Sequence, residues 1–361
     1  MPLLRHPYPR RLLTVPAAGG LLVLLVTLLP LWVLAAAAIS PLLPGRMRAL
    51  RLLWFLIVYL ALEVAGLVLA LGLWVASGLG YALRTERFRE AHYRVLAWLL
   101  AALMFAARRL FHLDLEVEAD PAPEDQPEVP HDDPRPMIVL ARHAGPLDSF
   151  LLVHELQWAY RRRPRIVLKS TFQWDPLIDV LLHRLHTRFI SSAREGMVAT
   201  IEELADDLGP EDAVMIFPEG ANFSRARRER MIARLEADGL DERAQRARRL
   251  RNLLPPRPGG ALAAIRAAPH ADVVFLAHAG IEHLYTVRDI WDALPMDTSV
   301  RARMWTVPAE EVPTDDEARM DWLYDWWDRL DDWLETAQGP APVRGRRVRW
   351  RRAAGHRRAG G

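Results

Sequence analysis

The sequence predicts an α/β domain with a mixed central sheet flanked by helices, preceded by an N-terminal membrane-embedded helical hairpin. Two long apolar runs lie near the N-terminus, a proline-rich acidic stretch follows them, and short β-branched runs then alternate with helical patterns. These changes predict a membrane anchor over residues 1–95, a folded α/β domain over 96–338 and a basic disordered tail over 339–361.

The two apolar runs are long enough to cross a bilayer. Residues 21–39 carry no charge over 19 positions, which matches a hydrocarbon core of roughly 30 Å. Pro30 predicts a kink in this run, and the second run, residues 52–83, is interrupted by one acid, Glu63, interpreted as facing the partner helix. Two spans or a re-entrant hairpin both fit. A cleaved signal peptide fits less well, because the first run is too long.

The arginines around these runs predict an orientation. Seven arginines lie before the first run or soon after the second, and three lie between the runs. Because cytoplasmic flanks carry the excess of basic residues, both ends of the hairpin are expected on the cytoplasmic side of the cell membrane. The lipid bilayer is therefore an expected partner.

Composition excludes several kinds of chemistry. The 361 residues are 51% hydrophobic and 25% charged, which is typical of a folded chain, and none is cysteine. Disulfides, thiol nucleophiles and thiolate metal sites are therefore excluded. The last eighteen residues carry eight arginines, and with an apolar hairpin upstream we expect them to contact anionic lipid and not nucleic acid. The sequence leaves the oligomeric state open.

Short apolar runs after the proline-rich stretch at 120–136 predict strands near residues 137, 165, 213 and 272. Residues 198–208 show a helical pattern between two of them, so the alternation predicts an α/β domain. Residues 225–251 are dense in Arg and Glu and predict a solvated helix and turn. Near the C-terminus, Trp322, Trp326, Leu330 and Trp333 recur at helical spacing and predict a helix packed against the domain.

Two motifs bear chemistry. His143 follows one predicted strand, and Asp148 opens the next helical pattern five residues later, so the carboxylate can orient the imidazole as a general base. The alternative is a loop histidine and a helix N-cap. The second motif, residues 216–220, ends another strand in Ile-Phe-Pro-Glu-Gly and is followed by a basic helical segment. A helix N-terminus with guanidinium groups suits a phosphate, and a turn before a solvated helix is the alternative.

The two motifs together resemble the signature of the glycerolipid acyltransferase family, which includes lysophosphatidic acid acyltransferases. In that family an HxxxxD motif is followed further along the chain by FPEG. In this sequence the two motifs are roughly seventy residues apart. Lys169, Pro176 and Arg194 occupy the places of the family's second block, and residues 253–282 are similar to its fourth. The resemblance covers roughly residues 90–335.

The resemblance implies transfer of a fatty acyl group from acyl-CoA or acyl-carrier protein to the hydroxyl of a lysophospholipid, with 1-acyl-sn-glycerol 3-phosphate as the expected acceptor. His143 would be the base and Asp148 would stabilise its imidazolium, without a cofactor or an acyl-enzyme. Glu219 and Gly220 would shape the acceptor pocket. The cations expected to neutralise the phosphate are Lys169, Arg194, Arg225 and Arg257. No metal is expected, because the histidine pairs His183 with His186 and His278 with His283 lack a convincing carboxylate ligand.

Two departures from the family pattern keep alternatives open. Arg142 stands where Asn is usual, either as a new cation for the substrate or as a surface arginine. Asn222 stands where an arginine usually holds the phosphate, so Arg225 or its neighbours substitute for it, or the acceptor differs. Other functions that fit are a catalytically silent membrane protein of the same fold that binds anionic lipid, or a hydrolase using Ser149 or Ser224, although neither serine lies in a GxSxG elbow.

Overall fold

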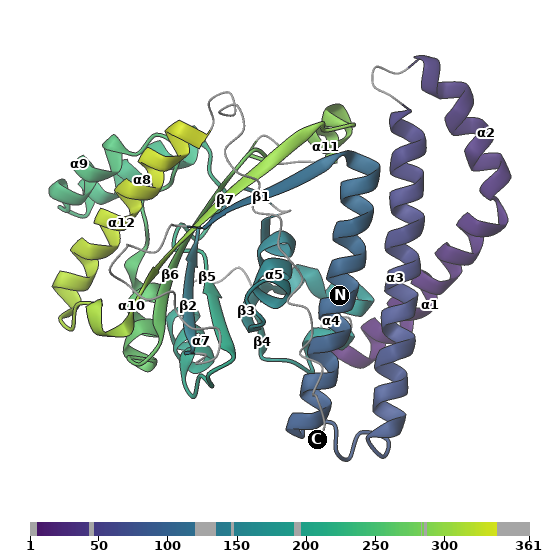
Figure 1. The fold of residues 1–361 in the computed structure, drawn as a ribbon, viewed down its shortest axis with the longest axis horizontal. Coiled ribbons are helices and arrows are strands. Elements are labelled where there is room, and N and C mark those ends of the chain that lie inside the picture. The colour runs from purple at the N-terminus through teal and green to yellow at the C-terminus, as the bar shows by residue number, and fades with distance from the viewer. Residues whose placement is uncertain are drawn as a thin grey trace, which may run out of the picture.

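The computed structural model describes residues 6–42, 47–119, 135–145, 148–190, 196–282, 284 and 287–337. A sheet with helices on both faces forms the larger part, and a group of long apolar helices stands at one end (Figure 1). The predicted basic tail, Arg194, His283 and most of the proline-rich stretch lie outside the described residues.

The seven-stranded sheet has the order β1-β7-β6-β2-β5-β3-β4. Strands β6 and β7 are antiparallel and the other neighbours are parallel, so the predicted mixed sheet is confirmed. The strands are β1 (Leu113–Ala119), β2 (Met137–Ala141), β3 (Arg163–Lys169), β4 (Thr187–Ile190), β5 (Asp212–Ile216), β6 (Asp272–Ala279) and β7 (Thr298–Val307).

The central strands β2, β5 and β6 are buried along their whole length. Strands covered on both faces need continuous apolar runs, which is why these three were evident in the sequence. One face packs against α7 (Met197–Ala205), α10 (Pro258–Ala267) and α12 (Asp316–Ala337). The other packs against α4 (Glu86–Phe111), α5 (Asp148–Trp158) and the end of α6 (Pro176–Leu182). Two basic helices, α8 (Arg225–Ala237) and α9 (Asp241–Arg249), lie where a solvated helix and turn were predicted.

Helix α12 confirms the packing predicted for the tryptophan-rich segment. Trp326 stacks on Phe275 of β6 with ring centroids 4.6 Å apart, and Trp327 is fully buried. The Trp327 indole N–H donates to the Leu254 carbonyl at 3.0 Å. Both carboxylate oxygens of Asp331 accept backbone N–H groups, from Arg251 at 2.8 Å and Asn252 at 2.7 Å. The helix therefore fixes the loop that leads from α9 to α10.

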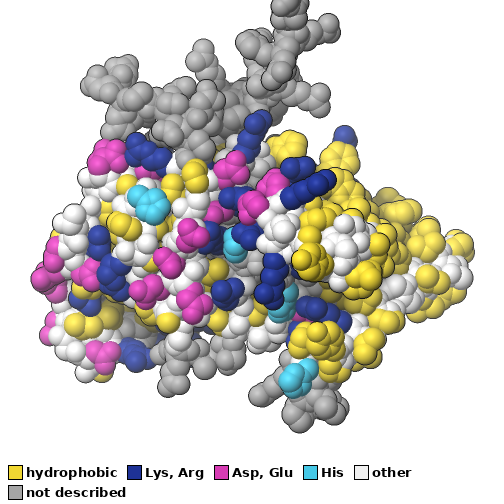
Figure 2. Space-filling view, turned by 90° about the horizontal axis from the view of Figure 1, so that it is seen from below, with side chains coloured by type: hydrophobic (Ala, Val, Ile, Leu, Met, Phe, Trp, Pro, Cys, Tyr) yellow, Lys and Arg dark blue, Asp and Glu magenta, His cyan; other side chains and the backbone are white. Residues whose placement is uncertain are grey.

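The N-terminal apolar helices are α1 (Pro7–Thr27), α2 (Leu29–Ile39) and α3 (Arg48–Ala76). A short 3-10 turn, Ser40–Leu42, follows α2. Helices α1 and α3 are long and apolar enough to cross a membrane. The chain breaks between α1 and α2, with Pro30 in the first turn of α2, as its place in the sequence predicted. Apolar side chains cover the end of the molecule formed by these helices, whereas charged ones gather at the other end (Figure 2).

The first helix begins further upstream than predicted and is bonded to the sheet domain. Arg10 is 4% exposed, and its guanidinium contacts the buried Asp179 of α6 at 2.6 Å. Arg11 Nε reaches the same carboxylate at 2.9 Å, and His183 Nδ1 lies 3.1 Å from it. Burial opposes the charge of Asp179, but the bonds from His183, Arg11 and Arg10 hold its pKa well below the ordinary range.

Glu63 does not face another helix of the hairpin, so that interpretation was wrong. Its carboxylate accepts the Leu177 backbone N–H at 2.8 Å, at the N-terminus of α6. Asp175 caps the same helix through Ile178 N at 2.8 Å and accepts the Tyr59 hydroxyl from α3. Free N–H groups at a helix start favour carboxylates. Helix α6 is therefore tied to both α1 and α3.

Candidate active site

The motif residues converge at one edge of the sheet. His143 follows β2, Glu219 follows β5, and His278 lies near the end of β6. These three strands are neighbours, and β2 runs parallel to both of the others, so their carboxyl ends meet. That edge is the usual place for a ligand site in an α/β sheet.

His143 and Asp148 form a hydrogen-bonded pair. Imidazole Nδ1 lies 3.1 Å from Asp148 Oδ2, and the Gly145 backbone N–H donates to the same oxygen at 3.0 Å. Asp148 is fully buried, whereas the His143 side chain is 21% exposed. A carboxylate that accepts from Nδ1–H leaves the Nε2 lone pair free, and Nε2 makes no hydrogen bond to the described residues. The predicted base and its orienting acid are thus brought together.

The pKa of Asp148 favours this arrangement. Burial alone would raise it, because a carboxylate loses its hydration. The hydrogen bond from His143 and the nearby His278 ring outweigh burial and move the pKa well below the ordinary value. Asp148 is therefore ionised at neutral pH and can stabilise a positive charge on His143.

Glu219 joins two segments of backbone. Its Oε1 accepts the His143 N–H at 2.8 Å, and its Oε2 accepts the Leu254 N–H at 2.9 Å. The side chain is fully buried, and this burial raises its pKa to about 7 although the two N–H groups favour the ionised form. Glu219 therefore connects the loop that carries the base with the loop that α12 holds.

The turn around Glu219 completes the site. The ring of Phe217 stacks on His143 with centroids 4.3 Å apart, and the Phe223 N–H donates to the His143 carbonyl at 3.2 Å. Gly220 has φ +66°, a left-handed conformation that glycine adopts without steric cost. A Cβ at Gly220 would also lie 3.4 Å from the guanidinium of Arg257.

Comparison with known protein families shows which family the sequence around this site matches. Residues 122–279 match the family model described as Acyltransferase, the family of glycerolipid and lysophosphatidic acid acyltransferases. This part of the chain is an acyltransferase domain. The match begins before β2 and ends with β6, so it contains both motifs. No curated protein matched the chain.

Three of the four predicted phosphate-binding cations lie within the described residues. Lys169 is exposed at the carboxyl end of β3, Arg225 is exposed at the start of α8, and Arg257 is exposed directly before α10. Arg225 follows Ser224, which caps α8 by accepting the Arg227 N–H at 3.3 Å. Arg257 is placed by its own N–H, which donates to the Pro218 carbonyl at 2.8 Å. Arg194 lies outside the described residues.

Arg142 is not a surface arginine. It is 1% exposed, and its Nη1 donates to the His278 carbonyl at 2.5 Å and to Glu282 Oε1 at 3.1 Å. Its Nη2 lies 3.4 Å from the Asn252 carbonyl. Arg142 therefore links the end of β2 to the end of β6 and to the loop between α9 and α10.

His278 was missed as a site residue. Its Nε2 lies 3.5 Å from Asp148 Oδ2, and its side chain is fully buried. The sequence showed a histidine near a strand end but gave no nearby carboxylate, because the contact depends on the pairing of β6 with β2. The β-strand pairing of Ala141 with Leu276 was the missing information.

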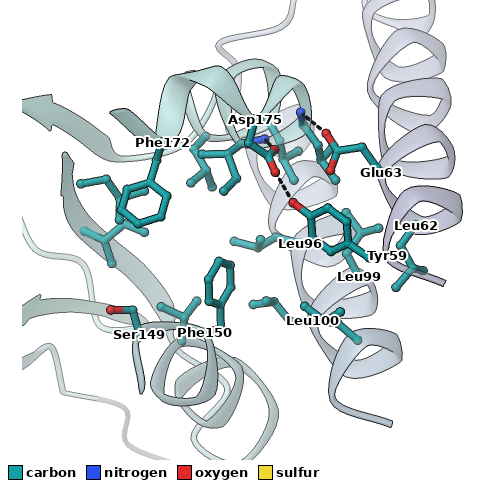
Figure 3. A pocket seen from close by; sticks show the side chains of 18 residues that line it. Tyr59, Leu62, Glu63, Leu96, Leu99, Leu100, Ser149, Phe150, Phe172 and Asp175 are labelled. Carbon is teal, nitrogen blue, oxygen red and sulfur yellow. Dashed lines mark hydrogen bonds between the residues drawn. The ribbon is translucent and has the colours of Figure 1, made fainter. Parts of the chain in front are cut away.

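An apolar pocket begins at Ser149, next to Asp148 in the chain. It lies between α3, α4, α5, α6 and the end of β3, and its lining includes Ser149, the neighbour of Asp148. In Figure 3, Ser149 and Phe150 lie at one side and Tyr59, Leu62 and Glu63 at the opposite side. The cavity volume of the pocket is about 130 Å³. Its lining thus includes residues of the acyltransferase domain and of an apolar N-terminal helix.

Proposed function

We propose that the protein is a membrane-bound O-acyltransferase that moves a fatty acyl group from acyl-CoA or acyl-carrier protein to the hydroxyl of a lysophospholipid. The acceptor we propose is 1-acyl-sn-glycerol 3-phosphate, in phospholipid synthesis or remodelling. The observation that carries this proposal is the His143–Asp148 pair, at 3.1 Å, inside an acyltransferase domain. A silent lipid-binding protein would not need an imidazole whose Nε2 is free.

The proposed chemistry is direct transfer. His143 Nε2 takes the proton of the acceptor hydroxyl as its oxygen attacks the thioester carbonyl. The carbon–sulfur bond then breaks, and the proton passes from His143 to the leaving thiolate. Asp148 stabilises the imidazolium between these steps, because it is ionised and hydrogen-bonded to Nδ1. Every atom is accounted for without a cofactor, a metal or an acyl-enzyme.

The apolar pocket supports a fatty acyl substrate. It has mostly leucine, isoleucine and phenylalanine walls, and it begins one residue from Asp148. An aliphatic chain gains roughly 0.8 kcal/mol per buried CH₂, so such walls suit a long chain. Because an apolar helix forms one side, a lipid could enter without crossing water.

A bulky side chain at the far side of the pocket should shorten the preferred acyl chain. Leu62→Trp places an indole where Figure 3 shows the pocket's α3 wall. We expect kcat/KM for the longest accepted chain to fall about 10- to 100-fold, with shorter chains little affected, because each excluded methylene is worth about 1–3 kcal/mol. The measurement is acyl transfer with donors of graded length. Leu69→Trp, exposed on the same helix, is the matched control.

The acceptor phosphate is proposed to bind Arg225 or Arg257. Each is exposed near the FPEG turn, where Asn222 provides no cation. Losing a charge-assisted bond should raise the acceptor KM about 10- to 100-fold in Arg225→Ala or Arg257→Ala, with the donor KM unchanged. Lysine at the same position should restore only part of the affinity. Arg266→Ala, an exposed arginine on α10 that pairs with Asp316, is the control.

Asn222 favours a second acceptor as the alternative. If both alanine variants keep the wild-type acceptor KM and Asn222→Arg creates activity toward 1-acyl-sn-glycerol 3-phosphate, the native acceptor has a different headgroup. That result would keep the acyltransferase and replace its substrate.

We propose that the catalytic domain faces the cytoplasm, where acyl thioesters are made. The support is the arginine distribution and the apolar helices α1 and α3. Protease added to sealed spheroplasts should leave the domain intact, and digestion from outside would reverse the orientation.

Membranes containing the protein test the whole proposal. Radiolabelled acyl-CoA or acyl-carrier protein is supplied with a panel of lysophospholipids, and the labelled product is identified. The expected product is a diacyl phospholipid from lysophosphatidic acid. Release of free fatty acid alone would indicate a hydrolase, and no turnover with any pair would indicate the silent lipid-binding protein.

A further inference from the structure

His278 is a buried histidine whose ring nitrogens lack conventional partners. It lies near the carboxyl end of the central strand β6, and its side chain is fully buried. Within the part of the chain that the structure describes, neither Nδ1 nor Nε2 makes a hydrogen bond. A buried polar group without a partner destabilises a fold, so such a ring calls for a specific explanation.

The carboxylate of Asp148 lies beside this ring. His278 Nε2 is 3.5 Å from Asp148 Oδ2, slightly beyond hydrogen-bonding distance. Asp148 Oδ1 is also buried and has no donor among the described residues. A turn of the carboxylate about its Cβ–Cγ bond that moves an oxygen by roughly 0.5 Å would complete the bond.

The backbone of His278 is held independently of Asp148. Arg142 Nη1 donates to the His278 carbonyl at 2.5 Å and to Glu282 Oε1 at 3.1 Å. Glu282 Oε2 in turn accepts the Gly280 N–H at 2.8 Å. Gly280 has φ +112°, and a Cβ there would lie 2.5 Å from the Ser299 carbonyl oxygen. The strand end that carries the His278 imidazole is therefore fixed, and the Asp148 carboxylate is the group that can move.

We propose that His278 is a positioning residue for acyl transfer: its Nε2–H donates to Asp148 and holds the carboxylate toward His143. An ionised carboxylate only accepts hydrogen bonds, so the ring nitrogen that faces it carries the proton. The groups facing Asp148 Oδ2 are then His143 Nδ1, the Gly145 N–H and His278 Nε2. The inference rests on the proposed function, in which His143 is the base.

This arrangement makes a specific prediction for turnover. A carboxylate whose Oδ2 is held by His278 as well as by the Gly145 N–H keeps that oxygen on His143 Nδ1, which fixes the imidazole's tautomer and orientation. Without His278 the carboxylate loses a charge-assisted bond and can rotate away. The effect should fall on kcat, because the His278 side chain is fully buried and acts through Asp148.

Three variants separate positioning from packing. In His278→Leu we expect kcat to fall about 10- to 100-fold with both KM values little changed. His278→Gln should recover most of the rate, since its amide N–H₂ can occupy the place of Nε2–H. His278→Asn carries its donor closer to the backbone and should stay as slow as leucine. His270→Leu, an exposed histidine just before the other end of β6, is the control.

A double-mutant cycle with Asp148→Asn tests whether His278 acts through that carboxylate. Once Asp148 is changed, His278→Leu should cost little more, because coupled residues are not additive. Multiplied losses in the double variant would overturn the proposal. A folded His278→Leu variant with wild-type kcat would also overturn it. Equal rates for the His278→Gln and His278→Asn variants would overturn it too, and this comparison can be made even if His278→Leu fails to fold. An inactive wild type would instead refute the proposed function.

Discussion

Replacing His143 with alanine should lower acyl transfer about 10²- to 10⁴-fold, the usual contribution of a positioned general base. The variant should remain folded and membrane-bound, because the side chain is partly exposed and the backbone bonds of residue 143 to Glu219 and Phe223 do not need the imidazole. Turnover is measured at saturating donor and acceptor, and the melting temperature reports the fold.

His270→Ala is the matched control for His143→Ala, because it removes an exposed histidine that lies just before the amino end of β6, away from His143. Its activity should equal that of the wild type. Asp148→Asn should be comparably slow, since it keeps the shape but removes the charge that stabilises imidazolium. Near-normal turnover in His143→Ala would mean that another group takes the acceptor's proton.

Glu219→Gln should weaken both stability and activity. The carboxylate accepts two backbone N–H groups, from His143 and Leu254, whereas an amide has one carbonyl oxygen and an N–H₂ that cannot accept. One buried donor is left unpaired, which costs about 1–3 kcal/mol of stability. Activity should fall at least tenfold, because the freed N–H belongs to a loop that positions the site.

Chemical unfolding and steady-state turnover check the Glu219 prediction. Glu211→Gln is the control, because Glu211 is an exposed carboxylate just before the other end of β5. It should change neither quantity. If Glu219→Gln kept wild-type stability and lost only acceptor binding, Glu219 would act on the substrate itself and not through the backbone.

The core of the fold could be predicted because its strands are continuous apolar runs. Strands β2, β3, β5 and β6 were all expected, each within a few residues of its position. Strands β1 and β7 were not expected, since both alternate apolar and charged residues and resemble surface segments. The same alternation is typical of a half-covered strand, so the signal was present in the sequence.

The contact between His143 and Asp148 could be predicted because the two residues are close in the chain. Five positions separate His143 from Asp148, so local geometry alone brings them together. The partners of Glu219, Arg142 and His278 could not be predicted, because each contact joins segments far apart in sequence. Arg142 meets Glu282 across 140 positions, and nothing near Arg142 indicates an acid.

The ion pairs between α1 and Asp179 make this apolar helix a structural part of the protein. A shortened form made to avoid detergent, beginning after α1, would remove both arginines from Asp179 and leave His183 as the described charged partner of that carboxylate. The loss of these charge-assisted bonds would weaken the attachment of α6, which forms a wall of the apolar pocket. Soluble fragments of this protein would therefore be poor guides to its chain-length preference, and a fusion partner is better placed after α12 than before Arg10.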